Sequence, residues 1–214
     1  MKQIEFFFDF ASPFAYLAHS PLPRIADRFG MEIVYRPIDL FEARTAAGNT
    51  GPSTPQIPNK FRYIRKDLVR WAEKYGIPFQ FPQPAAGQQV IAREQIDSSR
   101  AHKAMYFAIE QGRAREFATR LWSKTYAVGG FVGDDDNLRS TAHEMGWDAD
   151  RLLDYANSEA AQARYEVANR EAHERGVFGV PIMLIGEEMW WGNDRLSLME
   201  DYLEKHASEI ASAA

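Results

Sequence analysis

The 214-residue sequence contains no cysteine. The chain can therefore form no disulfide and no thiolate metal site, and it has no cysteine nucleophile. Any thiol that takes part in its chemistry must be brought in by another molecule. The five histidines include no pair four residues apart, the spacing that places two imidazoles on one face of a helix. We therefore expect no metal site.

Long apolar runs and an excess of positive charge are absent as well. No stretch reaches the roughly 18 apolar residues that a membrane helix needs, and the first residues lack the apolar core of a signal peptide. The net charge is −5, and no basic stripe is present to attract nucleic acid. We therefore expect a cytoplasmic protein that binds neither membranes nor nucleic acids. Its 45% hydrophobic residues are enough for a sizeable core.

The N-terminal part of the chain follows a strand–helix–strand pattern. Residues 3–10 are rich in aromatic side chains and predict a buried strand, and residues 31–39 predict a second strand. Residues 13–29 predict a helix, with Pro13 in its first turn and Gly30 just after its end. A unit of this kind usually forms two parallel strands with a right-handed crossover.

The middle of the chain is predicted to be mostly helical, because its apolar residues recur at helical spacing. Its predicted segments are, in order, a loop over residues 43–59, a helix from Asn59 to Tyr75, a connection over 81–92 and helices from about 95 to 175. Aspartates at 134–136 and at 148 are interpreted as the starts of helices rather than as metal ligands.

The C-terminal part returns to strands. Residues 182–185 and 189–191 predict a hairpin, and residues 194–206 predict a last helix. A strand–helix–strand unit and a strand–strand–helix unit together make a thioredoxin-like sheet. We therefore predict an α/β, thioredoxin-like fold with an inserted all-helical domain. The two domains would cover residues 1–40 with 176–214, and residues 41–175.

Ser12 occupies the reactive position of a thioredoxin-like unit, the turn after the first strand. Redox members of this fold carry two cysteines there, whereas this chain has Ser12, Pro13, Phe14 and Ala15, so dithiol chemistry by the protein is excluded. A hydroxyl at a helix start can donate to an external thiolate and lower the thiol pKa. Lowering it by two units requires about 2.7 kcal/mol, and one charge-assisted hydrogen bond contributes about 1.5–3 kcal/mol. The alternative is that Ser12 only caps the helix.

Two further segments suggest a thiol cofactor. Pro181, at the start of the third strand and facing the reactive turn, is either a cis proline that leaves Val180 free to pair with an extended peptide, or an ordinary trans proline. The turn of Gly192, Asn193 and Asp194 precedes a helix; its N–H groups could bind a carboxylate and Asp194 an ammonium, or the turn could be a cap only. A tripeptide thiol with an amino-acid-like end would match all these elements.

Four segments, spread over nearly the whole chain, resemble one known family. They are FFFDFASPFAYLA at residues 6–18, AAGNTGPS at 46–53, DLVRWAEKYGIPFQFP at 67–82 and GVFGVPIMLIGEEMWWGNDRL at 176–196. With these motifs the chain resembles the 2-hydroxychromene-2-carboxylate isomerases of bacterial aromatic degradation. Those enzymes are relatives of the kappa-class glutathione transferases and have a DsbA-like fold. The last segment is the most specific.

The resemblance implies glutathione as the cofactor. The family's serine, here Ser12, meets the glutathione sulfur, and the residue before the cis proline, here Val180 before Pro181, pairs with the cysteinyl backbone. Lys60 matches a family lysine near the glutathione pocket. The residues that would hold the γ-glutamyl end of glutathione are Trp191, Gly192, Asn193 and Asp194.

The resemblance also implies residues for the substrate. In the loop after the second strand the family has a basic residue for the substrate carboxylate, and Arg44 matches it approximately. Thr54 stands where members of the naphthalene pathway have asparagine, and Ala85 stands near a family tyrosine. These two departures line the pocket for the aromatic acid differently.

The function implied by the resemblance is a glutathione-dependent isomerase acting on a small aromatic carboxylic acid in aromatic catabolism. Thiolate addition to a 2-hydroxychromene-2-carboxylate-like acid, ring opening, bond rotation and elimination of glutathione would give the trans-benzylidenepyruvate isomer. Two alternatives stay open: a kappa-type glutathione transferase, which releases the conjugate, and a catalytically inert thioredoxin-like binding module. The resemblance further implies a homodimer.

Overall fold

One sheet organises the part of the chain that the structure describes. In the computed structural model, which describes residues 2–83 and 96–207, the strand order is β2-β1-β3-β4. β1 pairs with β2 in parallel, whereas β3 pairs antiparallel with β1 and with β4. The strands are β1 (Gln3–Phe8), β2 (Glu32–Pro37), β3 (Ile182–Ile185) and β4 (Glu188–Trp191). The predicted thioredoxin-like arrangement is confirmed.

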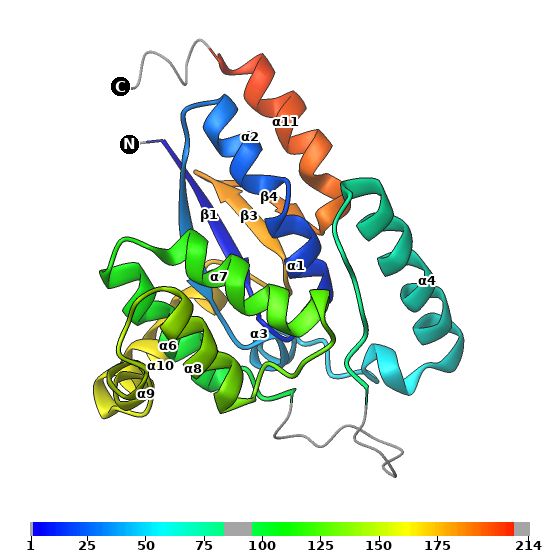
Figure 1. Ribbon diagram of the computed structural model, residues 1–214. Coiled ribbons are helices and arrows are strands. Elements are labelled where there is room, and N and C mark those ends of the chain that lie inside the picture. The colour runs from blue at the N-terminus through cyan, green and yellow to red at the C-terminus, as the bar shows by residue number, and fades with distance from the viewer. Residues whose placement is uncertain (1, 84–95, 208–214) are drawn as a thin grey trace.

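The crossover between β1 and β2 consists of two helices rather than one. α1 (Pro13–His19) and α2 (Leu22–Arg28) replace the single helix predicted over residues 13–29. That prediction was wrong because Pro21, between the two helices, has no N–H to bond to the preceding turn. The break lets α2 take its own direction along the sheet (Figure 1).

Residues 43–59, predicted as a loop, contain the end of a helix and a 3-10 turn. α3 (Leu40–Ala46) begins at Asp39, whose Oδ1 accepts hydrogen bonds from two backbone N–H groups in the first turn. The 3-10 turn covers Thr54–Gln56. The loop prediction was wrong at its start, because the prolines and glycines that suggested it all lie after α3 has ended.

α4 (Pro58–Tyr75) follows this segment. It begins one residue before the predicted cap Asn59, with Ile57 at the N-cap position and Pro58 in the first turn. It ends as predicted at Gly76, which has φ +67° and so adopts the left-handed conformation that suits glycine.

The helices predicted between about residues 95 and 175 are confirmed. They are α6 (Ser99–Glu110), α7 (Ala114–Trp122), α8 (Asp135–Glu144), α9 (Ala149–Ala156) and α10 (Glu159–Glu174), with a π-helical turn at Ser123–Ala127. Asp134 and Asp148 cap α8 and α9 through their side chains, as predicted. The last helix was predicted to begin at residue 194. A 3-10 turn covers Asn193–Arg195, and the helix, α11 (Leu196–Lys205), begins after it.

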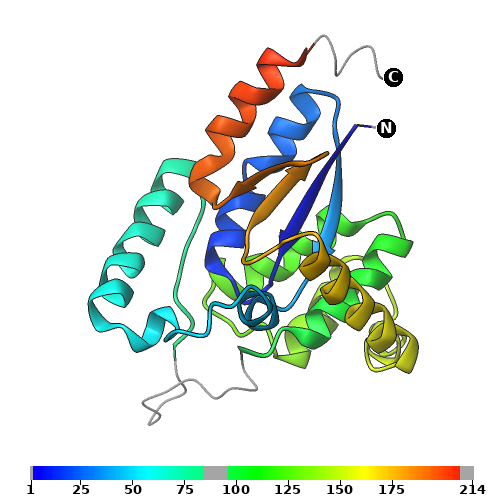
Figure 2. The ribbon, with the colours of Figure 1, turned by 180° about the vertical axis from the view of Figure 1, so that it is seen from behind.

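The sheet has a helical layer on one face and shorter cover on the other. α1, α2 and α11 lie on the face seen in Figure 1, and α3 lies against the opposite face seen in Figure 2. The main core is aromatic: Phe6, Phe8 and Phe10 pack around Trp122 of α7, which is fully buried and donates its indole N–H to the Phe10 carbonyl at 3.2 Å. Because this core joins β1 to the helical region, the division into two domains stays a prediction.

None of the helices in residues 2–83 and 96–207 is long and apolar enough to cross a membrane. Within the same residues there is no group of three or more histidine, aspartate or glutamate side chains placed to hold a metal ion.

Candidate active site

Ser12 lies in the turn that joins β1 to α1. Its backbone N–H donates to the Asp9 carbonyl at 2.9 Å, and its Oγ accepts the N–H of Ala15 at 3.3 Å, so Ser12 is the N-cap of α1. A serine hydroxyl can accept and donate at the same time. Within the described part of the chain, the Ser12 O–H has no acceptor. Capping the helix therefore leaves the hydroxyl proton available for a ligand.

Asp9 holds the backbone of this turn. Its Oδ1 accepts the N–H of Ala11 at 2.8 Å and the hydroxyl of Ser98 at 2.6 Å. Its Oδ2 accepts the N–H of Leu40 at 3.0 Å. The same Oδ1 lies 3.3 Å from Nε2 of His102. One buried carboxylate thus ties the β1–α1 turn to the first residue of α3 and to the start of α6.

The surroundings of Asp9 keep it ionised although it is only 5% exposed. Burial by itself would raise the pKa of the carboxyl, but attraction to His102 and hydrogen bonds from His102, Ser98 and the N–H of Leu40 outweigh burial and lower the pKa below its usual range. Nδ1 of His102 lies 3.1 Å from the hydroxyl of Tyr165, so the polar network continues into α10.

Two stacked tyrosines hold the turn from another side. The hydroxyl of Tyr126 donates to the Ala11 carbonyl at 2.6 Å, and that of Tyr16 donates to the Pro78 carbonyl at 2.7 Å. Their rings are 5.5 Å apart. Burial raises the pKa of both phenols, and the charge of Asp9 adds to the effect on Tyr126, so both remain donors at neutral pH.

The Val180–Pro181 peptide bond is cis, which decides between the two predicted alternatives. Ile182 pairs with Phe7, so Pro181 follows the register to a place beside Phe8, where β1 enters the reactive turn. Neither the N–H nor the C=O of Val180 forms a hydrogen bond with the residues that the structure describes. These two groups are therefore available to pair with the backbone of an extended ligand.

The turn at residues 192–194 lies next to Pro181. The N–H of Gly192 donates to the Pro181 carbonyl at 2.9 Å. Gly192 has φ +106°, and a Cβ built there would lie 2.5 Å from Oδ1 of Asp194, so only glycine fits this turn. Oδ2 of Asp194 accepts a hydrogen bond from the Arg195 guanidinium at 2.6 Å. The Asp194 carboxylate therefore already has one cationic neighbour on the surface.

Asn193 brings an unpaired donor to this turn. The residue is buried, and its Nδ2 has no hydrogen-bond partner among the described residues. The backbone carbonyl of Asn193 accepts a hydrogen bond at 3.0 Å from the hydroxyl of Tyr75, which lies at the end of α4. Buried polar groups are normally paired, so the free amide is a candidate donor for a ligand carboxylate. Tyr75 was predicted only as the end of a helix, and no pattern in the sequence indicated this contact.

The side chain of Trp191 packs on the loop before Pro181. Its indole meets the ring of Phe178 edge-on at 5.1 Å, and a Cβ on Gly179 would lie 3.1 Å from its Nε1. The residue pairs with Ile182 and is 55% exposed. Trp191 thus supports the proline loop, and its predicted contact with a cofactor stays a prediction.

The residues predicted for the substrate lie on separate surface segments. Arg44 is on α3, where its guanidinium donates weakly to Asn49 Oδ1 at 3.4 Å. Thr54 begins the 3-10 turn, and Lys60 is exposed in the first turn of α4. Figures 1 and 2 both place α3 and the start of α4 at the end of the molecule where α1 begins. Ala85 lies outside the described residues.

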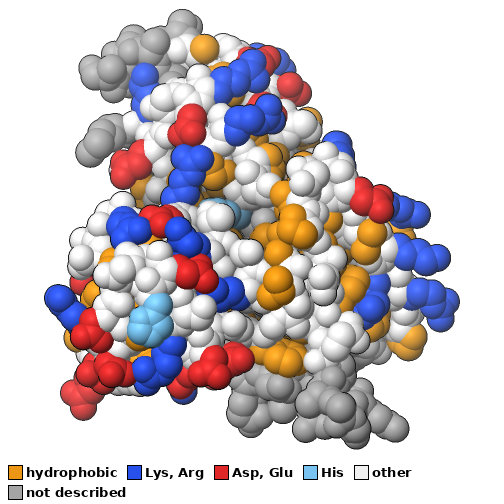
Figure 3. Space-filling model, in the orientation of Figure 1, with side chains coloured by type: hydrophobic (Ala, Val, Ile, Leu, Met, Phe, Trp, Pro, Cys, Tyr) orange, Lys and Arg blue, Asp and Glu red, His pale blue; other side chains and the backbone are white. Residues whose placement is uncertain are grey.

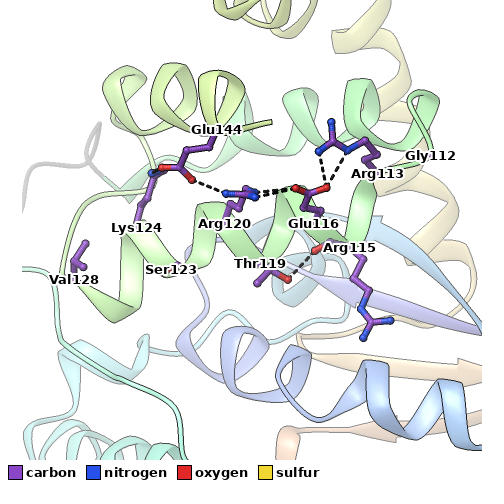
Figure 4. Close-up of a pocket in the computed structure, with 10 residues that line it drawn as sticks. All are labelled: Gly112, Arg113, Arg115, Glu116, Thr119, Arg120, Ser123, Lys124, Val128 and Glu144. Atoms are coloured by element: carbon purple, nitrogen blue, oxygen red, sulfur yellow. Dashed lines mark hydrogen bonds and ion pairs between the residues drawn. The ribbon is translucent and has the colours of Figure 1, made fainter. Parts of the chain in front are cut away.

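A surface hollow of about 780 Å³ lies elsewhere, on the outer side of α7 (Figure 4). Most of its charged side chains pair with one another, whereas Arg115 pairs with Asp27, which does not line the hollow. Arg113 and Arg120 bind Glu116, while Arg120 and Lys124 bind Glu144. Because most of these charged side chains are held in ion pairs and the hollow is formed by none of the predicted site residues, we do not assign the site there.

Comparison with known proteins identifies the family. The model of the DSBA-like thioredoxin domain matches residues 3–204. A 2-hydroxychromene-2-carboxylate isomerase from Sphingobium xenophagum is 41% identical over 94% of this chain and 98% of its own. A solved structure of a 2-hydroxychromene-2-carboxylate isomerase has a TM-score of 0.87 at 33% identity and covers 99% of both chains. The rat glutathione S-transferase kappa 1 is 24% identical over 92% of this chain and 89% of its own. The chain therefore belongs to the DSBA-like thioredoxin domain family and, within it, to the group of the 2-hydroxychromene-2-carboxylate isomerases.

Proposed function

We propose that this protein is a glutathione-dependent isomerase of a 2-hydroxychromene-2-carboxylate-like acid. The observation that carries the proposal is the Ser12 hydroxyl, which caps α1 through its lone pair and keeps its proton for an acceptor. Because the chain has no cysteine, a thiolate that accepts this proton would have to come from another molecule. The names and identities of the relatives support the same substrate class.

Three segments would hold glutathione. The Ser12 O–H would donate to the sulfur, the main chain of Val180 would pair with the cysteinyl peptide, and the turn at Asn193 and Asp194 would bind the γ-glutamyl end. Lys60 and Trp191 would contribute from the rim of the site. When bound, glutathione supplies a thiolate that adds reversibly to a conjugated carbon of the acid and permits rotation about the bond that must isomerise.

The protein's own groups would control charge and geometry. Ser12 would stabilise the thiolate, and Asp9 and Tyr126 would keep the turn in place through Ala11. Arg44 would neutralise the substrate carboxylate, because a carboxylate that enters a partly apolar site unpaired is costly. We further propose that Thr54 contacts the substrate. Action in the cytoplasm, in aromatic catabolism, and as a homodimer belongs to the same proposal.

Titration of the thiol tests the proposal directly. We expect bound glutathione to have a thiol pKa one to two units below its ordinary value of about 8.5, because a charge-assisted hydrogen bond contributes about 1.5–3 kcal/mol. The ultraviolet absorbance of the thiolate, followed with pH in the presence and absence of protein, measures the shift. An unchanged pKa in the saturated complex would rule out this role of Ser12.

Arg44→Ala should weaken the binding of the acid. Loss of a charged hydrogen bond worth about 1–3 kcal/mol predicts a rise in KM of roughly 5- to 150-fold. Glutathione affinity should barely change. Arg24→Ala, which removes an exposed arginine from α2, is the matched control. An unchanged KM in Arg44→Ala would assign the binding of the substrate carboxylate to Lys60 or Arg62 instead.

Product analysis separates the isomerase from a kappa-type transferase. The same thiolate serves both reactions, so the site geometry is common to them. An isomerase returns free glutathione in every cycle, whereas a transferase accumulates a stable adduct. Chromatography of a reaction with limiting glutathione decides: many turnovers per glutathione support the isomerase.

A further inference from the structure

α4 is positively charged, whereas the protein as a whole is negatively charged. It contains six cations and two carboxylates, a net charge of +4, in a chain whose total is −5. The six cationic side chains are all exposed. They are Lys60, Arg62, Arg65, Lys66, Arg70 and Lys74. Figure 3 shows lysine and arginine side chains gathered over α4 at the right edge of the molecule.

Four of these cations form a single row. Arg62, Lys66, Arg70 and Lys74 follow one another at intervals of four residues, so neighbouring side chains share one face of the helix. Like charges at this spacing repel and destabilise a helix. The row therefore does not help α4 to fold, and its explanation lies outside the helix.

The cations of α4 also differ from those at α7 in their ionic contacts. None of the six forms an ion pair with any residue in 2–83 or 96–207, whereas on α7 and its π-helical end Arg113, Arg120 and Lys124 are all paired with glutamates. Two of the six rest on aromatic rings: Arg65 lies 4.0 Å from the ring centre of Phe81, and Lys74 lies 4.6 Å from that of Trp71. A cation on a ring keeps its charge available to a third group.

This helix runs alongside the candidate site. At its C-terminal end Tyr75 donates to the Asn193 carbonyl at 3.0 Å, and just beyond it the Pro78 carbonyl accepts the hydroxyl of Tyr16 from α1. Figure 1 shows part of α4 beside α1. The row of Arg62, Lys66, Arg70 and Lys74 lies on the face of α4 opposite the buried Leu68 and Ala72, so it faces solvent on the helix that flanks the site.

We propose that the positive charge of α4 attracts anionic ligands towards the site and speeds their association. This inference rests on the proposed function, in which glutathione and the aromatic acid both carry a net negative charge. The chain as a whole is acidic and would repel both of them at long range. A positive helix beside the site makes the local field more favourable to anions and speeds their association, with an effect that salt screens over about 10 Å at 0.1 M.

The test compares two triple variants of equal charge. R62Q/K66Q/R70Q removes three cations from the row. R24Q/R170Q/K205Q removes three exposed cations from α2, α10 and α11, which also have no ion pair with the described residues. Stopped-flow fluorescence measures the association rate of glutathione at low and high ionic strength. The diethyl ester of glutathione, which has a net positive charge, is the second probe.

We expect the α4 variant to associate with glutathione roughly tenfold more slowly than wild type at low salt and at the same rate at high salt. The control variant should stay within about twofold of wild type, and the ester should associate no more slowly with the α4 variant. The Tm of the α4 variant should not fall, because the row is repulsive. Equal rates in the two variants, or a salt-independent rate in wild type, would overturn the inference and leave the proposed function intact. Failure of wild type to bind glutathione at all would overturn both.

Discussion

Ser12→Ala is expected to lose about 10- to 150-fold in turnover, which corresponds to the 1.5–3 kcal/mol of a charge-assisted hydrogen bond. The hydroxyl proton acts on the thiolate, so its loss affects the reacting sulfur most. The ends of glutathione would be held by Val180 and by the turn at Asn193, so we expect glutathione affinity to change by no more than about threefold, the effect of less than 1 kcal/mol. Steady-state kinetics and calorimetric titration measure the two quantities.

Ser12→Gly separates the two roles of the side chain. The Oγ of Ser12 also caps α1 through the N–H of Ala15, and loss of a cap costs about 1 kcal/mol of stability for alanine but only a few tenths for glycine. Ser12→Gly should therefore lose as much turnover as Ser12→Ala while unfolding closer to wild type. Turnover that follows stability instead would reduce Ser12 to a cap. Ser12→Cys should form no dithiol couple, because Ala15 provides no second thiol.

The fold was predictable because its evidence is local in sequence. Apolar residues at alternate positions and at helical spacing indicated the strand–helix–strand unit in the N-terminal part and the strand–strand–helix unit in the C-terminal part. The order of these two units is enough to specify a thioredoxin-like sheet. The errors came from single residues. Pro21 divides a helix whose apolar pattern continues across it. Asp39, predicted as the end of a strand, caps α3, which extends into residues predicted as a loop. Periodicity does not weigh such residues strongly enough.

The placement of the candidate site residues, though not their roles, was predictable where it depends on residue type at a turn. Ser12, the Val180–Pro181 bond and the turn at Gly192 all lie at one end of the sheet, as their positions before and after strands require. What surrounds them was not predictable from the sequence. His102 and Tyr126 contact the reactive turn although they lie about a hundred positions away in the sequence. No local pattern encodes these contacts.

Asp9 shows the same limit most clearly, since it interrupts an aromatic strand pattern and its partners come from distant segments. A charged residue there suggests only that the strand ends. In the structure its two carboxylate oxygens accept hydrogen bonds from Ala11, Ser98 and Leu40 and face His102. A charged residue within the aromatic strand pattern was the only hint of this network in the sequence. It could not be interpreted without knowing which distant residues surround Asp9.

Asp9→Asn should destabilise the protein by about 1–3 kcal/mol, the cost of leaving a buried hydrogen-bond donor of this network unpaired. An amide in place of the carboxylate turns one acceptor into a donor, which would face a donor such as the N–H of Leu40. Urea unfolding at neutral pH measures the loss. Asp27→Asn is the matched control, because Asp27 is exposed and its pair with Arg115, at 3.3 Å, lies on the surface, where such pairs contribute about 0–1 kcal/mol.

The pH dependence of this difference identifies the charge as its cause. The pKa of Asp9 is lowered in the folded state, since His102 and the hydrogen bonds outweigh burial. The stabilisation is therefore complete above the unfolded pKa of about 3.9 and is lost as the pH falls through the lower folded value. The gap between wild type and Asp9→Asn should be constant near neutral pH and should narrow below about pH 4. A gap that is independent of pH would mean that Asp9 contributes through its shape alone. Turnover should fall with the charge as well, because the same carboxylate holds the N–H of Ala11, next to Ser12.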